Sequence, residues 1–294
     1  MSVLVTGGAG FIGSHIVDVL VARGDDVVVL DDLSGGSRDN LPAQVPILQI
    51  DIADPACVSM IAEARPRTVI HAAAQVSVGH SMADPARDRE VNVVGTAHLL
   101  DGAKRCGCQR AIFISTGGAI YGETSGASET AIPHPKSYYS AHKYLAERYF
   151  ELSGVSYGIA RLANVYGPRQ RSDLEGGVVS IFSERLRAGE PIVIQGTGQQ
   201  YRDFVYVTDV VSAVLAMLDS RLEGTWNVAT GTATTVLELL DALQARIAPP
   251  TEICHEASRP GDLFASVLLN GQIRQDLGWQ PRFDLAAGLD DMLR

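Results

Sequence analysis

VLVTGGAGFIG, at residues 3–13, joins a short aliphatic run to a cluster of glycines. The run is typical of a buried strand, and the pattern after it is typical of a helix. The glycines satisfy both the GxGxxG and the GxxGxxG spacing. Such glycines allow a tight turn and let a pyrophosphate approach the backbone at the helix N-terminus. The stretch therefore predicts a dinucleotide-binding turn formed by Gly7, Gly10, Phe11, Ile12 and Gly13.

An acidic pair follows the second predicted strand, about 20 residues after the glycines, where ribose recognition requires an acid. This strand, at 27–30, leads into Asp31 and Asp32. A carboxylate here accepts hydrogen bonds from the adenosine ribose and repels a 2′-phosphate, so we expect NAD rather than NADP. Asp51 and Ile52 follow the third predicted strand, where a carboxylate could meet the adenine amino group. A strand-end aspartate is equally often a cap, and both interpretations stay open.

Short apolar runs alternate with longer helical patterns through the first half of the chain, which predicts βαβ units. Helices are expected to begin near Gly10, Pro55, Pro85 and Ser137, and strands are expected at 3–5, 27–30, 46–50, 68–71, 111–115 and 155–162. The predicted fold is α/β, with a Rossmann-type doubly wound parallel sheet and a smaller mixed α/β substrate lobe. We expect residues 1–163, with a returning segment near 201–232, to form the NAD-binding domain. Residues 164–200 and 233–294 form the smaller lobe in this prediction.

Composition narrows the class of protein. The 294 residues include 24 Lys and Arg against 34 Asp and Glu, which gives a net charge of −10, and 46% are hydrophobic. This balance argues against nucleic acid or an anionic membrane as partner. The four cysteines form no CxxC pair, so we expect reduced thiols, no metal site and a cytoplasmic location. No signal peptide or membrane span is expected.

A tyrosine and a lysine stand four residues apart in YSAHK, at residues 139–143. On a helix this spacing puts Tyr139 and Lys143 on one face. Free tyrosine has a pKa of about 10 and is a poor base at neutral pH, but a neighbouring ammonium and a nicotinamide cation favour the phenolate. The hydroxyls of Ser115 and Thr116 end a preceding strand, at the sheet edge where such folds bind ligands. Tyr139 is therefore predicted to be a general base, assisted by Lys143.

Six motifs in order make the chain resemble the extended short-chain dehydrogenase/reductase superfamily, and within it the NAD-dependent nucleotide-sugar epimerases and dehydratases. They lie at residues 6–15, 71–75, 92–96, 115–122, 139–143 and 164–169. The resemblance covers essentially the whole chain. It implies that Tyr139 removes the proton of the sugar 4-hydroxyl while C4 passes a hydride to NAD, which leaves a 4-ketose. It also implies that Ala72, Ala73, Asn92 and Lys143 contact or support the cofactor.

The loop after Thr116 distinguishes reactions within this family. Dehydratases and decarboxylases typically carry an acid there, whereas this chain has Gly117 and Gly118. The loop instead resembles that of UDP-glucose (UDP-galactose) 4-epimerases, which implies a UDP-hexose 4-epimerase. Many of these have a serine or threonine at the position aligned with Gly117. We expect Thr116, with Ser115 behind it, to replace that hydroxyl.

Further residues are expected to bind the UDP-sugar, because similar segments of the family hold the diphosphate, the ribose or the sugar. They are Ser77, Asn164, Arg202, Arg259 and Asp262. An arginine suits phosphate because its planar guanidinium donates two parallel hydrogen bonds. The resemblance also suggests a homodimer built through the helices that carry Asn92 and Tyr139.

Other functions remain open at this point. Arg171, in a segment that resembles UDP-glucuronate 4-epimerases, could meet a C5 carboxylate, so UDP-glucuronate and UDP-galacturonate are the alternative substrates to UDP-glucose and UDP-galactose. A nucleotide-sugar dehydratase or reductase is a lesser alternative, and so is a non-catalytic NAD-binding sensor.

Overall fold

The computed structural model describes residues 2–173, 177–249, 252–258 and 263–294. The chain divides into two compact units. The first contains the chain up to Thr116 together with Ser137–Arg161 and Val211–Trp226. The second contains Gly117–Lys136, Leu162–Val210 and Asn227–Arg294. Each unit has its own secondary structure and is described separately.

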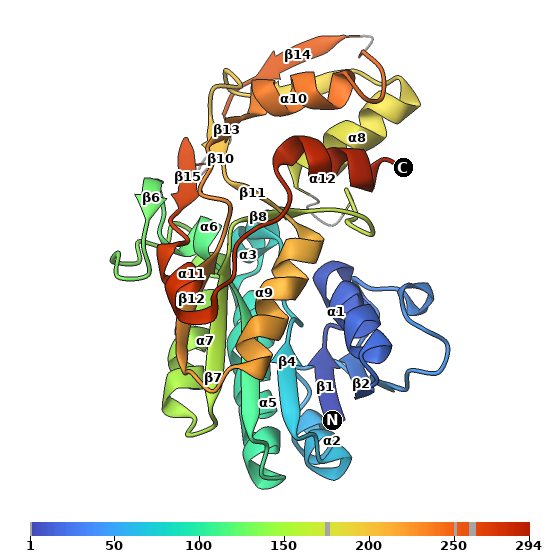
Figure 1. Cartoon of the computed structure of the whole chain (residues 1–294), viewed down its shortest axis with the longest axis vertical. Helices are drawn as coiled ribbons and strands as arrows, with labels where there is room; N and C mark the ends of the chain where they lie inside the picture. The colour runs from blue at the N-terminus through green and yellow to red at the C-terminus, as the bar shows by residue number, and fades with distance from the viewer. Residues whose placement is uncertain (1, 174–176, 250–251, 259–262) are drawn as a thin grey trace. The chain divides into compact units, whose positions relative to one another are not determined.

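A seven-stranded sheet organises the first unit, in the order β12-β7-β5-β4-β1-β2-β3 (Figure 1). Its strands are β1 (Ser2–Thr6), β2 (Asp26–Asp31), β3 (Ile47–Gln49), β4 (Thr68–His71), β5 (Arg110–Thr116), β7 (Tyr157–Leu162) and β12 (Gly224–Val228). The pairs from β3 through β2, β1 and β4 to β5 are parallel. The predicted Rossmann-type sheet is thereby confirmed, and β12 adds a seventh strand to the six expected.

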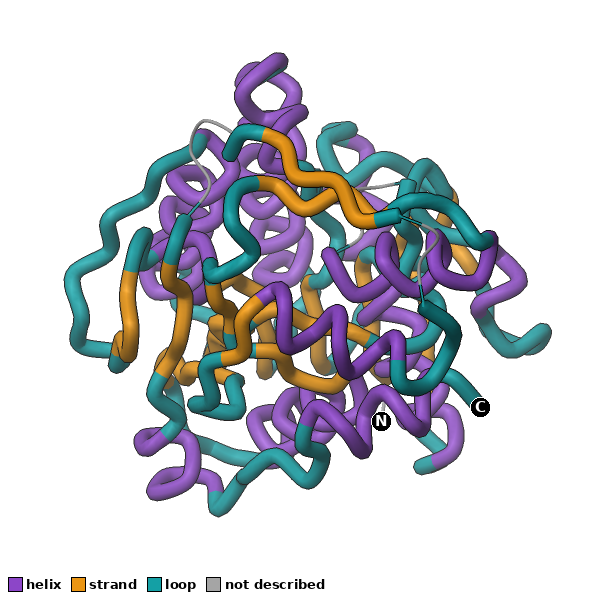
Figure 2. The backbone as a smooth tube through the Cα atoms, turned by 90° about the horizontal axis from the view of Figure 1, so that it is seen from above, coloured by secondary structure: helices purple, strands orange, loops and turns teal. Residues whose placement is uncertain are grey.

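Helices connect these strands and pack on both faces of the sheet (Figure 2). They are α1 (Phe11–Ala22), α2 (Ala56–Ala64), α3 (Val78–Ala83), α4 (Pro85–Arg89), α5 (Gly95–Arg105), α7 (Tyr138–Leu152) and α9 (Val207–Asp219), with a short 3₁₀ turn η1 (Arg38–Asn40) and a π-helical turn η2 (Glu90–Val94). Asp84 caps α4 by accepting a hydrogen bond from the Arg87 amide, and Pro85 occupies the first turn. Ser137 and Ser140 form a capping box that fixes the start of α7. Start signals in the sequence therefore locate these helices well.

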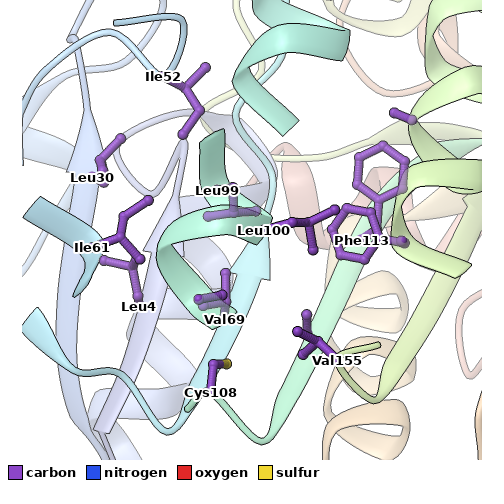
Figure 3. Packing of buried hydrophobic residues seen from close by; sticks show 14 of the residues in the cluster. Leu4, Leu30, Ile52, Ile61, Val69, Leu99, Leu100, Cys108, Phe113 and Val155 are labelled. Atoms are coloured by element: carbon purple, nitrogen blue, oxygen red, sulfur yellow. The ribbon is translucent and has the colours of Figure 1, made fainter. Parts of the chain in front are cut away.

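The core of the first unit lies between the sheet and helices α2, α5 and α7. Leu4, Val69 and Phe113 from the strands belong to one cluster of buried apolar side chains with Ile61 of α2 (Figure 3). Parallel strands covered on both faces are expected to be continuously hydrophobic, as these are. This rigid layer fixes the carboxyl ends of β1, β4 and β5.

The second unit contains smaller sheets and several helices. A four-stranded sheet has the order β13 (Thr234–Thr235), β10 (Tyr201–Arg202), β15 (Ala265–Leu268) and β6 (Thr124–Ala127). Two-stranded parallel pairs are β8 (Asn164–Tyr166) with β11 (Phe204–Tyr206), and β9 (Ile192–Gln195) with β14 (Ile253–Glu256). The helices are α6 (Gly117–Ile120), α8 (Val178–Ala188), α10 (Val236–Gln244), α11 (Gly271–Leu277) and α12 (Leu285–Met292). No helix among the described residues is long and apolar enough to cross a membrane.

Candidate active site

The glycine-rich turn joins β1 to α1 and leaves no room for side chains. Gly7 has φ +65°, and a Cβ there would lie 2.5 Å from the Ala73 amide nitrogen. A Cβ on Gly13 would lie 2.1 Å from the Gly7 carbonyl oxygen. No side chain of the described residues caps the start of α1 at Gly10, and its first turn has no acid. The first amides of α1, at Phe11 and Ile12, are therefore suited to an anionic group such as a pyrophosphate.

Asp31 ends β2 beside this turn. Its carboxylate accepts a hydrogen bond from the Ala9 amide at 2.9 Å and one from the Leu33 amide at 2.8 Å. Burial raises the pKa of the carboxyl, and the two backbone hydrogen bonds oppose that rise. Asp32 instead accepts hydrogen bonds from the Ser34 amide and hydroxyl. Asp31 is thus fixed to the glycine-rich turn, whereas Asp32 organises the exposed loop after it.

Asp51 and Ile52 follow β3. One Asp51 oxygen accepts a hydrogen bond from the Ala53 amide, and the other lies 2.5 Å from an Arg87 nitrogen. Ile52 is buried in the core. The carboxylate of Asp51 therefore acts as a turn cap and ion-pair partner in this structure, and a role toward adenine stays a prediction.

A hydrogen-bonded chain runs behind the turn. Thr6 Oγ1 lies 2.7 Å from His71 Nδ1, and His71 Nε2 lies 3.1 Å from Thr96 Oγ1, which donates to the Asn92 carbonyl oxygen. Burial, together with the charge of Lys143, lowers the pKa of His71 to about 3, so the ring is neutral. The chain ties β1 and β4 to the helix that carries Asn92.

The backbone after β4 takes part in the same arrangement. The Ala72 amide donates to the Thr6 carbonyl oxygen at 3.0 Å, and the Ala73 amide lies 3.3 Å from Thr6 Oγ1. The Asn92 side chain is buried and donates to the Gln75 carbonyl oxygen. Among the residues that the structure describes, Asn92 Oδ1 is a buried acceptor without a hydrogen-bond partner. Such an atom needs a donor, which a bound ligand or water could supply.

Tyr139 and Lys143 lie one turn apart on α7, and Tyr139 is partly exposed whereas Lys143 is buried. Lys143 Nζ donates to the Ile114 carbonyl oxygen at 2.7 Å and lies 4.1 Å from the centre of the Phe113 ring. Burial lowers the pKa of Lys143 to about 7, and the charges of Glu147 and Asp88 oppose that fall. The ammonium is therefore held against the end of β5 by a carbonyl, an aromatic face and nearby carboxylates.

Ser115 and Thr116 differ in what their hydroxyls can reach. Ser115 is buried, and its Oγ donates to Glu147 Oε1 at 2.7 Å. The Glu147 carboxylate is also held by the buried Arg161, whose nitrogens lie as close as 2.6 Å. Thr116, the last residue of β5, is partly exposed. The environment of Ser115 favours Thr116 as the hydroxyl that can face a substrate.

The predicted substrate-binding residues are distributed over both units. In the first, Ser77 is buried and caps α3 by accepting a hydrogen bond from the His80 amide. In the second, the Arg202 guanidinium donates to carbonyl oxygens of Tyr201, Leu263 and Phe264. Arg259 and Asp262 lie outside the described residues.

Asn164 and Arg171, also in the second unit, have contrasting surroundings. Asn164 Oδ1 lies 3.4 Å from where a Cβ on Gly118 would be, so the two residues are neighbours. Arg171 is exposed and forms an ion pair with Asp173, with nitrogen and oxygen 2.6 Å apart.

Three buried groups near Lys143 escape sequence reasoning: Asp88, Glu147 and Arg161. Glu147 had a usable signal, because it continues the spacing of four residues from Tyr139 through Lys143. Asp88 and Arg161 had none, since Asp88 meets His142 across 54 positions and Arg161 meets Glu147 across 14. The structure thus joins the predicted catalytic and cofactor residues of the first unit through groups that the sequence analysis did not single out.

Comparisons with known proteins show which family this chain is similar to. The model of the NAD dependent epimerase/dehydratase family matches residues 3–229. A UDP-glucose 4-epimerase of Mycolicibacterium smegmatis is 41% identical, over 98% of this chain and 96% of that protein. A crystal structure of UDP-glucose 4-epimerase with UDP-glucose from Thermotoga maritima is 41% identical, with a TM-score of 0.96 over 100% of this chain and 97% of the other. The Thermus thermophilus UDP-glucose 4-epimerase complex with NAD is 42% identical, with a TM-score of 0.95 over the same shares.

Proposed function

This chain belongs to the NAD dependent epimerase/dehydratase family, and on that premise we propose that it is an NAD-dependent UDP-glucose 4-epimerase. It would invert C4 of UDP-glucose and UDP-galactose through a transient 4-ketose. The observation that carries this proposal is nearly full-length identity of about two residues in five with UDP-glucose 4-epimerases. The glycines that replace an acid after Thr116 favour epimerisation over dehydration, because no second acid or base stands at that point of the loop.

The residues of the first unit fit NAD. The glycine-rich turn is closed to side chains, the start of the described α1 has no side-chain cap, and Asp31 is fixed beside it. We propose that the amides of Phe11 and Ile12 bind the pyrophosphate and that Asp31 binds the adenosine ribose. The buried Asn92 Oδ1 offers a further acceptor on the cofactor side. When bound, NAD supplies the hydride acceptor and donor.

The proton is handled by α7 and β5 in this proposal. Tyr139 removes the proton of the sugar 4-hydroxyl, and the Lys143 ammonium stabilises the phenolate that does so. Thr116 donates a hydrogen bond to the sugar oxygen at C4. Ser115 stays bound to Glu147 and holds the end of β5 in place. When the hydride comes back to the opposite face of the ketose, Tyr139 returns the proton to the C4 oxygen, which completes the inversion and restores the phenolate.

The nucleotide must stay anchored while the sugar ring turns. We assign Arg202 and Arg259 to the diphosphate, Asp262 to the ribose, and Asn164 and Ser77 to the phosphates and sugar. Charge supports the arginine assignments, since an anionic ligand of a protein with net charge −10 needs placed cations. In the structure the Arg202 guanidinium donates to carbonyl oxygens, and the same N–H groups can donate to phosphate oxygens.

A neutral sugar is favoured over a uronate by the surroundings of Arg171. This side chain is exposed and already paired with Asp173, so reading a C5 carboxylate would require it to leave that partner. We therefore keep UDP-glucuronate as the second candidate substrate and UDP-glucose as the first.

We further propose a homodimer built through the helical segments that carry Asn92 (η2) and Tyr139 (α7), and a cytoplasmic location. The dimer accords with exposed apolar side chains on α7, at Leu145, Tyr149 and Leu152. The location accords with four free thiols at Cys57, Cys106, Cys108 and Cys254, since disulfides are rare in the cytosol. Mass measurement in solution would test the dimer.

The purified protein should be incubated with UDP-glucose and, separately, with UDP-galactose, and the sugars resolved by NMR. We expect both reactions to reach the same mixture while the nicotinamide absorbance stays constant over many turnovers. A stoichiometric change in that absorbance would instead identify a net reductase or dehydrogenase. NAD binding without any product from either sugar would identify a sensor.

A further inference from the structure

Asp88 of α4 is a fully buried carboxylate that is bound from three directions. Its Oδ1 lies 2.5 Å from Nδ1 of His142, and its Oδ2 accepts hydrogen bonds from Gln75 Nε2 at 2.6 Å and Asn92 Nδ2 at 3.1 Å. The Asp88 side chain has no exposed surface. A buried carboxylate is costly unless its lone pairs are satisfied, and these three donors satisfy them.

The three partners lie on segments that carry site residues. His142 stands between Tyr139 and Lys143 on α7. Asn92 lies in the π-helical turn on the cofactor side. Gln75 holds Ser77, because its Nε2 donates to the Ser77 carbonyl oxygen and its Oε1 accepts from the Ser77 amide. One carboxylate therefore connects the catalytic helix, the cofactor side and a substrate loop.

Asp88 also contributes a negative charge to the surroundings of Lys143. The charges that act on Lys143 include those of Glu147 on its own helix and of Asp88 on α4, and Lys143 in turn acts on His71 of β4. The Glu147 carboxylate is already bound by the Arg161 guanidinium through both oxygens. The Asp88 carboxylate is bound instead by two neutral amides and an imidazole. Glu147 is thus bound by a guanidinium, which is permanently charged, whereas these three partners of Asp88 include no such group.

We propose that Asp88 is a positioning residue, whose buried carboxylate aligns α7 through His142 and places a negative charge beside the helical turn that carries Lys143. The inference rests on the catalytic role proposed above for Lys143. The effect on the lysine can nevertheless be measured without turnover. Burial disfavours the charged form of a lysine, and a nearby anion offsets that effect.

The sequence provides a direct probe, since the chain has three lysines, Lys104, Lys136 and Lys143. Lys104 and Lys136 are exposed. The protein is labelled with ¹⁵N at lysine Nζ and saturated with NAD, and it should give one NMR signal for each lysine. The variants Lys104→Arg and Lys136→Arg each remove one signal, which assigns the remaining one to Lys143. The titration midpoint of Lys143 is then followed by NMR in wild type and in variants at the Asp88 contact.

Asp88→Asn removes the charge and keeps the hydrogen bonds possible. Its amide oxygen can accept from Gln75 and Asn92, while its NH₂ donates to His142 Nδ1 in the other neutral tautomer. The matched control is His142→Asn, whose Nδ2 replaces the imidazole Nδ1 and leaves Asp88 charged. We expect Asp88→Asn to lower the Lys143 midpoint by about half a pH unit or more, and His142→Asn to leave it near the wild-type value.

The alkaline limb of kcat against pH should move in the same direction in Asp88→Asn, because Lys143 loses its proton at lower pH. Equal shifts of the Lys143 midpoint in both variants would show that helix packing, and not the charge of Asp88, determines this midpoint. That result would overturn the proposal. The proposal would also be overturned if Asp88→Asn folds and its Lys143 midpoint equals that of the wild type. If Asp88→Asn fails to fold, His142 does not adopt the other tautomer to accept from the new amide. That outcome would also overturn the proposal. The Lys143 midpoint could fall in Asp88→Asn although the wild-type protein does not interconvert the UDP-sugars. The inference about charge would then stand, and the proposed epimerase function would be rejected.

Discussion

The Ser115 hydroxyl donates to Glu147 across 2.7 Å, and both side chains are buried. Glu147 in turn accepts hydrogen bonds from the buried Arg161, so the serine is part of a closed polar cluster. Its neighbour Thr116 is partly exposed at the end of β5. Two adjacent hydroxyls of similar chemistry thus have separate expected roles, one in the structure and one toward the substrate.

Thr116→Val should therefore lower kcat by about 10- to 100-fold, which corresponds to about 1.5 to 3 kcal/mol for one hydrogen bond to a developing charge. Ser115→Ala should mainly lower the unfolding temperature, because it leaves a Glu147 lone pair without its donor. Steady-state kinetics and thermal unfolding of both variants check this. A silent Thr116→Val beside a catalytically impaired but stable Ser115→Ala would exchange the two roles.

Tyr139→Phe should lower turnover by about 100-fold or more, because it removes the proton acceptor and little contact area. NAD should stay bound, since the glycine-rich turn and Asp31 are unaffected. Turnover and the NAD content of the purified variant are the measurements. Activity close to wild type would rule out Tyr139 as the base.

Asp31→Ala combined with Asp32→Arg should shift cofactor preference towards NADP, because the carboxylate that repels a 2′-phosphate is removed and a cation is added. The Asp31 carboxylate also holds the Ala9 and Leu33 amides, so affinity for both cofactors should fall. The ratio of the two dissociation constants is therefore the test, and Asp31→Asn, which removes the charge and keeps one of the two acceptor oxygens, is the control. An unchanged ratio would mean that another group reads the ribose.

Arg171→Ala should leave turnover of UDP-glucose and UDP-galactose within about twofold of wild type, because the side chain is exposed and paired with Asp173. Specificity constants should be measured for these sugars and for UDP-glucuronate and UDP-galacturonate. If uronate turnover dominates in the wild type and collapses in the variant while the neutral sugars are spared, Arg171 reads a carboxylate and the preferred substrate is a uronate.

The sequence alone was sufficient for the features that depend on local pattern. The residues at 7 and 13 must be glycines because neighbouring backbone fills the space of a Cβ, and that requirement is visible as spacing. Apolar runs predicted six strands of the sheet, and capping residues such as Ser137 marked helix starts. The spacing of Tyr139 and Lys143 predicted a shared helix face. Each of these signals lies within about 20 residues of chain.

The tertiary structure decided how the buried charges are paired. Asp88 meets His142 across 54 positions of sequence, and Ser115 meets Glu147 across 32, so no local periodicity reports either contact. Whether a hydroxyl at the end of β5 faces a ligand or a buried carboxylate depends on which helix packs against that strand. The free energy of a buried charge is set by its partners in space, and those partners are brought together only when the sheet and its helices have assembled.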